Sequence, residues 1–125
     1  MDADPHGEQP ILRDGTDLDA ADAAVILVHG RGATARSILA LGHQVATDGV
    51  ALLAPQAAGN EWYPNSFLAP IESNEPGLSS GLRRAKRALE TAEDAGVPRE
   101  QILLLGFSQG ACLASEFAAR NPTEY

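Results

Sequence analysis

The sequence predicts an α/β fold in which a parallel sheet is covered by helices on both faces. Three short apolar runs, at residues 23–28, 50–54 and 101–105, are continuous rather than alternating, which is typical of strands buried on both faces. A segment with helical spacing lies between consecutive runs, and another follows the last one. This order requires right-handed crossover connections and therefore a parallel sheet.

Length and composition indicate one globular domain over residues 1–125, with 44% hydrophobic and 5% aromatic residues. No apolar run approaches the roughly 20 residues of a membrane span, and the start MDADPHGEQP lacks the features of a signal peptide. A net charge of −8 argues against nucleic acid or anionic membrane as a partner. The single cysteine excludes an internal disulfide. We therefore expect a soluble cytoplasmic protein. Oligomeric state is not predicted.

Residues 1–22 are rich in Asp, Gly and Pro and show no clear period. We expect this segment to be poorly structured, with at most a short edge strand at Pro10 to Arg13. His6 falls in this flexible start, where reaching the rest of the chain would require an unsupported fold-over.

The first buried strand is predicted at Ala23 to Val28 and ends at His29-Gly30. Helical spacing follows over residues 31–46, with Thr34 as a plausible N-cap and Gly42 as a locally unfavourable residue. The apolar positions of this helix are Ile38, Leu39, Leu41 and Val45.

The second strand, Val50 to Ala54, is stopped by Pro55. Residues 55–77 then show no period and carry four prolines and the only tryptophan. Loops of this length inside a compact domain are usually functional. A helix follows over residues 79–96, with Ser79 or Ser80 as its cap, Gly96 and Pro98 at its end, and one apolar face formed by Leu78, Leu82, Ala85, Leu89 and Ala92.

The third strand, Gln101 to Leu105, leads into Gly-Phe-Ser-Gln-Gly and a last helix from about Ser108 to Arg120, ended by Asn121-Pro122. Gly-x-Ser-x-Gly between a strand and a helix predicts a sharp, strained turn that exposes the Ser108 hydroxyl. Gly106 and Gly110 lack Cβ atoms, so strand and helix can approach closely. The backbone N–H of Gln109 would point at an oxyanion formed on a bound substrate. The alternative is a plain strand-to-helix turn.

A second oxyanion donor is expected from the loop His29-Gly30-Arg31-Gly32, through the backbone N–H of Arg31. The side chain of His29 is interpreted as an anchor of this loop rather than as a general base. Cys112, one helical turn after the serine, is interpreted as a buried small hydrophobe.

Three stretches of text, VILVHGRGA, LLAPQAAGNEWYPNSFLAP and GVPREQILLLGFSQGACLASEFAARNP, resemble the phospholipase/carboxylesterase group of α/β-hydrolases, relatives of the acyl-protein thioesterases. The resemblance covers residues from about Val25 to Pro122. It implies the N-terminal half of an α/β-hydrolase fold, with Ser108 as nucleophile and the N–H groups of Arg31 and Gln109 as the oxyanion hole. It also implies that Trp62 and Tyr63 wall the substrate pocket. From the residues alone, Trp62 could equally cover the core.

A serine nucleophile needs a base, normally a histidine oriented by a carboxylate, and in α/β-hydrolases both follow the serine. After Ser108 the chain has Glu116 and Glu124 but no histidine. Glu116 is expected on a helix surface, and His43 is expected to be solvated on its helix.

We therefore expect a truncated hydrolase whose full-length form cleaves carboxylic esters or thioesters through an acyl-enzyme, while these 125 residues alone are inactive. The alternatives are a non-catalytic α/β binding module and a chain to which a partner supplies Asp and His. No metal-ligand spacing, phosphate loop or dinucleotide fingerprint is present, so no metal or cofactor is expected.

Overall fold

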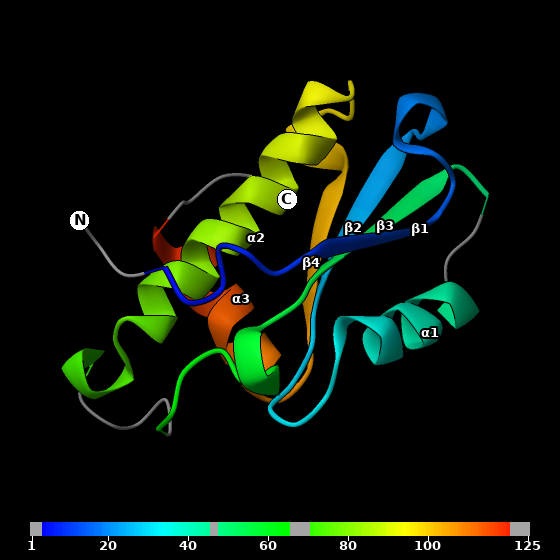
Figure 1. The fold of residues 1–125 in the computed structure, drawn as a ribbon. Coiled ribbons are helices and arrows are strands. Elements are labelled where there is room, and N and C mark those ends of the chain that lie inside the picture. Colours follow the sequence, from blue (N-terminus) through cyan, green and yellow to red (C-terminus); the bar gives the residue numbers. More distant parts are fainter. Residues whose placement is uncertain (1–3, 46–47, 66–70, 121–125) are drawn as a thin grey trace.

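The computed structural model describes residues 4–45, 48–65 and 71–120, and it has one four-stranded sheet with strand order β1-β3-β2-β4 (Figure 1). The central strand β2 pairs in parallel with both β3 and β4, whereas β1 pairs antiparallel with β3. The α/β architecture predicted from the three apolar runs is confirmed. The strands are β1 (Ile11–Gly15), β2 (Ala23–Val28), β3 (Val50–Pro55) and β4 (Ile102–Gly106).

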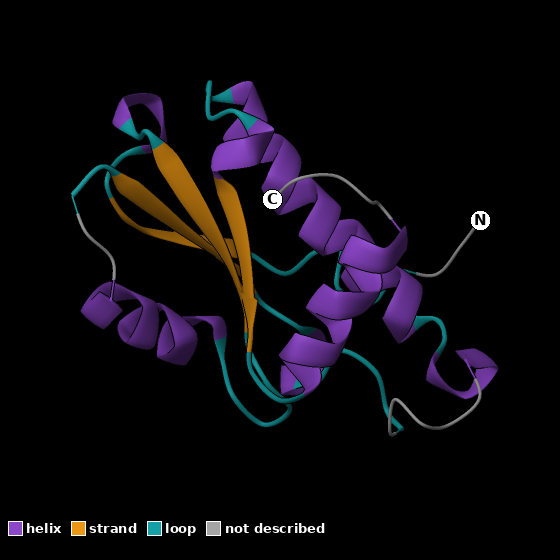
Figure 2. Cartoon of the chain, turned by 180° about the vertical axis from the view of Figure 1, so that it is seen from behind, coloured by secondary structure: helices purple, strands orange, loops and turns teal. Residues whose placement is uncertain are grey.

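Helices cover both faces of the sheet: α1 lies on one face, and α2 and α3 lie side by side on the other (Figures 1 and 2). Successive residues of β2 alternate between two hydrophobic clusters, with Ile26 in the cluster beneath α2 and α3 and Leu27 in the cluster beneath α1. This double burial explains the continuous apolar runs of β2 and β3, whereas β4 at the edge of the sheet is not buried on both faces as its run predicted. The helices are α1 (Ala35–Val45), α2 (Gly77–Asp94) and α3 (Gln109–Arg120), with short 3₁₀ turns at Leu18–Ala20, Ala58–Asn60, Ile71–Asn74 and Arg99–Gln101.

The N-terminal segment is better ordered than its sequence predicts. An edge strand forms at Ile11–Gly15, slightly later than the expected position. His6 is buried: its backbone N–H donates to Ser80 Oγ (2.9 Å), and its ring nitrogens bond to backbone groups near Trp62. The expectation of a flexible start at His6 is therefore wrong, because partners 52–74 residues away along the chain hold it.

Helix α1 begins as the sequence indicates, with Thr34 as its cap: the Ser37 N–H donates to Thr34 Oγ1 at 3.0 Å. Gly42, which the sequence marked only as unfavourable for a helix, packs closely against the sheet. A Cβ at this position would lie 2.8 Å from a methyl carbon of Leu27, so a larger residue would require the end of the Leu27 side chain to move.

Helix α2 begins at Gly77, two residues earlier than expected, so Ser79 and Ser80 lie within its first turn and are not its cap. Instead, the Glu75 carboxylate accepts the Ser79 N–H (2.7 Å), a role that the sequence did not assign to this residue. The five apolar positions predicted for the buried face are all buried. The helix ends at Asp94, and Gly96, two residues later, has a φ of +105° and donates its N–H to Glu93 O, as expected for the predicted glycine stop.

The outer edge of β4 is apolar and exposed. Leu103 and Leu105 lie beside Val25 and Leu27 on the α1 face of the sheet, beyond the reach of α1, and Leu103 is 54% exposed. A hollow of about 440 Å³ runs between β4 and α3. Within the described ranges, no strand pairs with this edge. An unpaired apolar edge of this kind is a site for association with another polypeptide.

Within those same residues, none of the helices combines the length and the hydrophobicity that crossing a membrane would require.

Candidate active site

Ser108 occupies the turn between β4 and α3, at the carboxyl end of the parallel strands. Its φ is +58°, a left-handed conformation that is rare for a residue with a Cβ atom, and the residue is exposed. The strained, exposed turn predicted from Gly-x-Ser-x-Gly is therefore present. A strand-to-helix turn with ordinary backbone angles would not hold the serine in this way.

The two glycines of the turn allow the close approach that the sequence suggested. A Cβ on Gly110 would lie 1.9 Å from Val28 O and 2.5 Å from His29 O, and a Cβ on Gly106 would lie 2.4 Å from Gly110 O. No side chain fits in either place. The start of α3 is consequently packed against the end of β2, which fixes Ser108 above the sheet.

The loop after β2 comes directly beside the serine. A Cβ on Gly30 would lie 3.2 Å from the Cβ of Ser108 and 3.0 Å from Phe107 O. Gly32 has a φ of +78° and donates its N–H to Asn60 O at 2.8 Å. Gly30 is the residue of this loop that lies next to Ser108. Arg31 follows it directly and is flanked on its other side by Gly32.

The two predicted oxyanion donors are both open. Among the residues that the structure describes, neither the backbone N–H of Arg31 nor that of Gln109 has a hydrogen-bond acceptor. Gln109 is also the first residue of the 12-residue helix α3, where the helix dipole favours negative charge. The arrangement can stabilise an anion that forms on a carbonyl bound at Ser108.

His29 is fully buried and serves as an anchor, as its position in the sequence suggested. Its Nε2 accepts the Ala57 N–H (3.0 Å), so its Nδ1 carries the proton and donates to Gly30 O (2.9 Å). Burial lowers the pKa of His29. With both ring nitrogens engaged in this way, His29 has no lone pair to accept a proton from Ser108.

Trp62 lies beneath the site and is 0% exposed. Its ring stacks on His29, with centroids 5.0 Å apart, and meets His6 edge-on at 5.1 Å. The indole N–H donates to His29 O (2.9 Å), and the Trp62 carbonyl accepts from His6 Nε2 (2.7 Å). Trp62 therefore belongs to the core, the alternative that the sequence left open, and its role in a pocket stays a prediction.

Tyr63 is 4% exposed, and burial raises the pKa of its hydroxyl to about 12, with the neighbouring Cys112 thiol as the next cause. Cys112 itself is half-buried rather than buried as expected. Because the Tyr63 side chain is buried, it forms no exposed surface of a pocket beside Ser108 among the described residues. A contribution of Tyr63 to a substrate pocket stays a prediction.

The remaining candidates for acid or base groups lie elsewhere. His43 is exposed on the last turn of α1, with its Nδ1 3.7 Å from a carboxylate oxygen of Asp14 on β1. Glu116 bonds to Arg120 on the surface of α3 (2.8 Å). Glu124 lies outside the described residues. The sequence did not indicate a role for the side chains of Arg31 and Gln109, which hydrogen-bond to the segment around Trp62, although both lie in stretches that carry the family resemblance.

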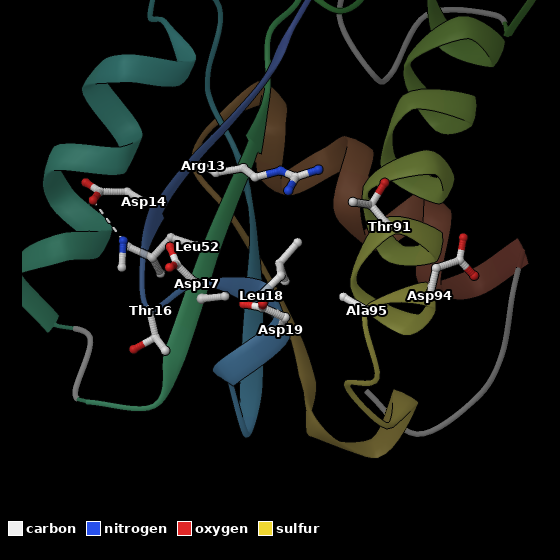
Figure 3. A pocket seen from close by; sticks show the side chains of 12 residues that line it. Arg13, Asp14, Thr16, Asp17, Leu18, Asp19, Leu52, Thr91, Asp94 and Ala95 are labelled. Atoms are coloured by element: carbon white, nitrogen blue, oxygen red, sulfur yellow. Dashed lines mark hydrogen bonds between the residues drawn. The ribbon is translucent and has the colours of Figure 1, made fainter.

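One cavity among the described residues lies away from the serine. It measures about 720 Å³ and lies at the other end of the sheet, between the end of β1 and the last turns of α2 (Figure 3). Arg13, Asp17 and Asp94 are among its lining side chains. Ser108 contributes to neither this cavity nor the hollow beside β4.

Comparisons with known proteins agree with this fold. A phospholipase/carboxylesterase from Dyadobacter fermentans DSM 18053 has a solved structure that matches with a TM-score of 0.91 and 42% sequence identity, over 94% of this chain and 56% of that chain. Esterase PE8 matches with a TM-score of 0.62 and 25% identity, over 93% of this chain and 59% of that chain. A search of curated proteins found no match.

The chain thus spans a little over half the length of the solved structures that it matches, and it forms part of an α/β-hydrolase fold. Residues 16–125 match the family model described as Phospholipase/Carboxylesterase. The resemblance drawn from the three stretches of sequence is confirmed. The chain belongs to the phospholipase/carboxylesterase family.

Proposed function

We propose that Ser108 is the nucleophile of a serine hydrolase that cleaves carboxylic esters or thioesters through an acyl-enzyme. The observation that carries this proposal is the geometry of the turn. An exposed serine with a φ of +58° stands at the carboxyl end of β4, beside two backbone N–H groups that have no acceptor among the described residues. Family membership supports ester hydrolysis as the reaction class.

In the proposed reaction, Ser108 Oγ attacks the carbonyl carbon while a base removes its proton. The carbonyl oxygen becomes an oxyanion, which accepts hydrogen bonds from the N–H groups of Arg31 and Gln109. Loss of one such donor typically lowers kcat about 10²- to 10³-fold. The alcohol or thiol leaves with the proton held by the base, and water then hydrolyses the acyl-serine.

The base and its orienting carboxylate are proposed to come from outside the described residues, from chain that follows Tyr125 or from a partner. His6 and His29 support this view because their ring nitrogens are engaged by backbone groups. His43 lies on the final turn of α1, paired with Asp14 near the cavity at the far end of the sheet. The lack of an available histidine base among the described residues also favours the second candidate, a non-catalytic binding module that keeps the Ser108 turn without a Ser-His-Asp triad.

A fluorophosphonate probe separates the two candidates. We expect the full-length gene product that contains these residues to be labelled, and expect Ser108→Ala to abolish labelling. Ser115→Ala, which removes another exposed serine on α3, is the matched control and should label normally. Labelling that persists in Ser108→Ala, or a folded full-length protein that does not label, would exclude the hydrolase and favour the binding module.

The proposal also concerns the leaving group, which is an alcohol in an ester and a thiol in a thioester. Backbone donors at Arg31 and Gln109 bind a carbonyl oxygen whether the leaving atom is oxygen or sulfur, so we propose both esters and thioesters as substrates. Comparing kcat/KM for an acyl ester and an acyl thioester with the same acyl chain tests this breadth. Turnover of only one of the two would restrict the proposal to that class. A cytoplasmic location, with its reducing conditions, stays part of the proposal and is tested by cell fractionation.

A further inference from the structure

The side chains of the two proposed oxyanion residues bind the same short segment, residues 61–65. The guanidinium of Arg31 donates to three successive backbone carbonyls of this segment, those of Tyr63 (3.1 Å), Pro64 (3.0 Å) and Asn65 (3.3 Å). It also pairs with the Glu61 carboxylate at 2.9 Å. The planar fork of an arginine can serve several acceptors at once, which a lysine cannot do.

Gln109 binds the segment from the opposite side of the site. Its buried side-chain amide accepts the Trp62 N–H through Oε1 (2.7 Å) and donates to Tyr63 O through Nε2 (2.8 Å). The primary amide of glutamine offers a donor and an acceptor side by side without carrying a charge. The backbone of the segment is therefore paired to the first residue of α3.

The carbonyl of Tyr63 is the point at which both side chains meet. It accepts one hydrogen bond from Arg31 and one from Gln109, which uses both of its lone pairs. Arg31 belongs to the loop after β2, and Gln109 is the first residue of α3. A single carbonyl thus connects two parts of the chain that are 78 positions apart in the printed sequence.

The loop around Arg31 needs such a connection. Arg31 lies between Gly30 and Gly32, and glycine restricts the backbone less than any other residue. Hydrogen bonds hold its neighbours, since Gly32 N–H donates to Asn60 O and Gly30 O accepts from His29, and the side chain of Arg31 adds a further anchor to the 61–65 segment. Two donors act together on an oxyanion only if each lies about 2.7–3.1 Å from it, and a misplacement of about 1 Å can cost a factor of about 10² in rate.

We propose that the 61–65 segment sets the spacing of the oxyanion hole, and that the side chains of Arg31 and Gln109 are positioning groups acting through the carbonyl of Tyr63. This inference rests on the proposed function, since it assigns a role within the same reaction. It gives each residue two tasks: its backbone N–H binds the oxyanion, and its side chain fixes where that N–H lies.

The test uses the full-length gene product and a p-nitrophenyl ester. Arg31→Lys keeps the charge but loses the fork, and Gln109→Glu keeps the acceptor for Trp62 while losing the donor to Tyr63. We expect each variant to lower kcat about 10-fold or more with little change in KM, because the oxyanion forms only in the transition state. Arg36→Lys on the exposed surface of α1 is the matched control and should leave kcat unchanged.

A double-mutant cycle gives the decisive readout. If both side chains act through one carbonyl, the double variant should lose little more kcat than the worse single variant. Losses that multiply, or single variants with normal kcat, overturn the inference while leaving Ser108 as the nucleophile. A purely structural role would reduce the urea midpoint of the variants and leave kcat per folded molecule at the wild-type value, which also overturns it. Wild-type protein without turnover or fluorophosphonate labelling would instead overturn the proposed function and, with it, this inference.

Discussion

Replacing Gly110 by alanine tests how the turn around Ser108 is built. The new Cβ would lie 1.9 Å from Val28 O, whereas real Cβ atoms essentially never come within 3.0 Å of such an atom. The clash is with backbone, so the start of α3 must move away from β2 by about 1 Å. The turn cannot absorb this movement locally, because Ser108 already has a strained φ.

The size of the effect follows from what moves with α3. Overpacking of this kind costs about 1–3 kcal/mol. A movement of that size also stretches the two buried bonds of the Gln109 amide, now 2.7 and 2.8 Å long, beyond hydrogen-bond distance. Each lost bond costs about 1 kcal/mol. We therefore expect Gly110→Ala to lower the free energy of unfolding by about 3–5 kcal/mol, a large share of the roughly 5–15 kcal/mol of a typical domain.

Urea unfolding followed by fluorescence measures this loss, because Trp62 is the only tryptophan and its backbone N–H bonds to Gln109. Gly32→Ala is the matched control: its φ is +78°, but nothing lies within 4 Å of a Cβ there, so only the backbone penalty of about 1–2 kcal/mol applies. If Gly110→Ala costs no more than Gly32→Ala, the close approach of α3 to β2 is refuted.

Two further predictions concern stability and association. Burial lowers the pKa of both His6 and His29 below 6.5, so the stability of the folded chain should be complete above about pH 6.5 and fall as the pH drops below it. Urea midpoints at about pH 7.5 and pH 5.5 check this; equal midpoints would contradict the burial of the two rings. Leu103→Lys should reduce self-association of the 125-residue chain in light scattering by charging the open edge of β4, whereas Leu41→Lys on exposed α1 should not; equal effects would mean that this edge does not drive association.

Strands and turns whose cause is local were predictable from the sequence. The run Ala23–Val28 forms a strand with the predicted bounds, because burial on both faces requires consecutive apolar residues. The turn at Ser108 was predictable because its two glycines are needed wherever a strand and a helix approach this closely. The cap of α1 at Thr34 likewise depends on a residue three positions away.

Features that depend on distant partners were not predictable in the same way. His6 is ordered by Ala58, Trp62 and Ser80, and no periodicity near residue 6 encodes those contacts. Helix α2 starts before its serines because Glu75, outside the helix, accepts the N–H of Ser79. The contacts of the Arg31 and Gln109 side chains with the 61–65 segment were hidden for the same reason: that segment has no period, and its partners are 30–47 positions away along the sequence.

Trapping the acyl-enzyme tests the central proposal, that Ser108 carries the acyl group, most directly. The full-length gene product is mixed with a p-nitrophenyl ester, quenched with acid during the first turnover and analysed by intact mass and peptide mapping. We predict one acyl group per chain, on the peptide that contains Ser108, and no acylation of Ser108→Ala. An acyl group on another residue, or full turnover by Ser108→Ala, would contradict the assignment of Ser108 as the nucleophile.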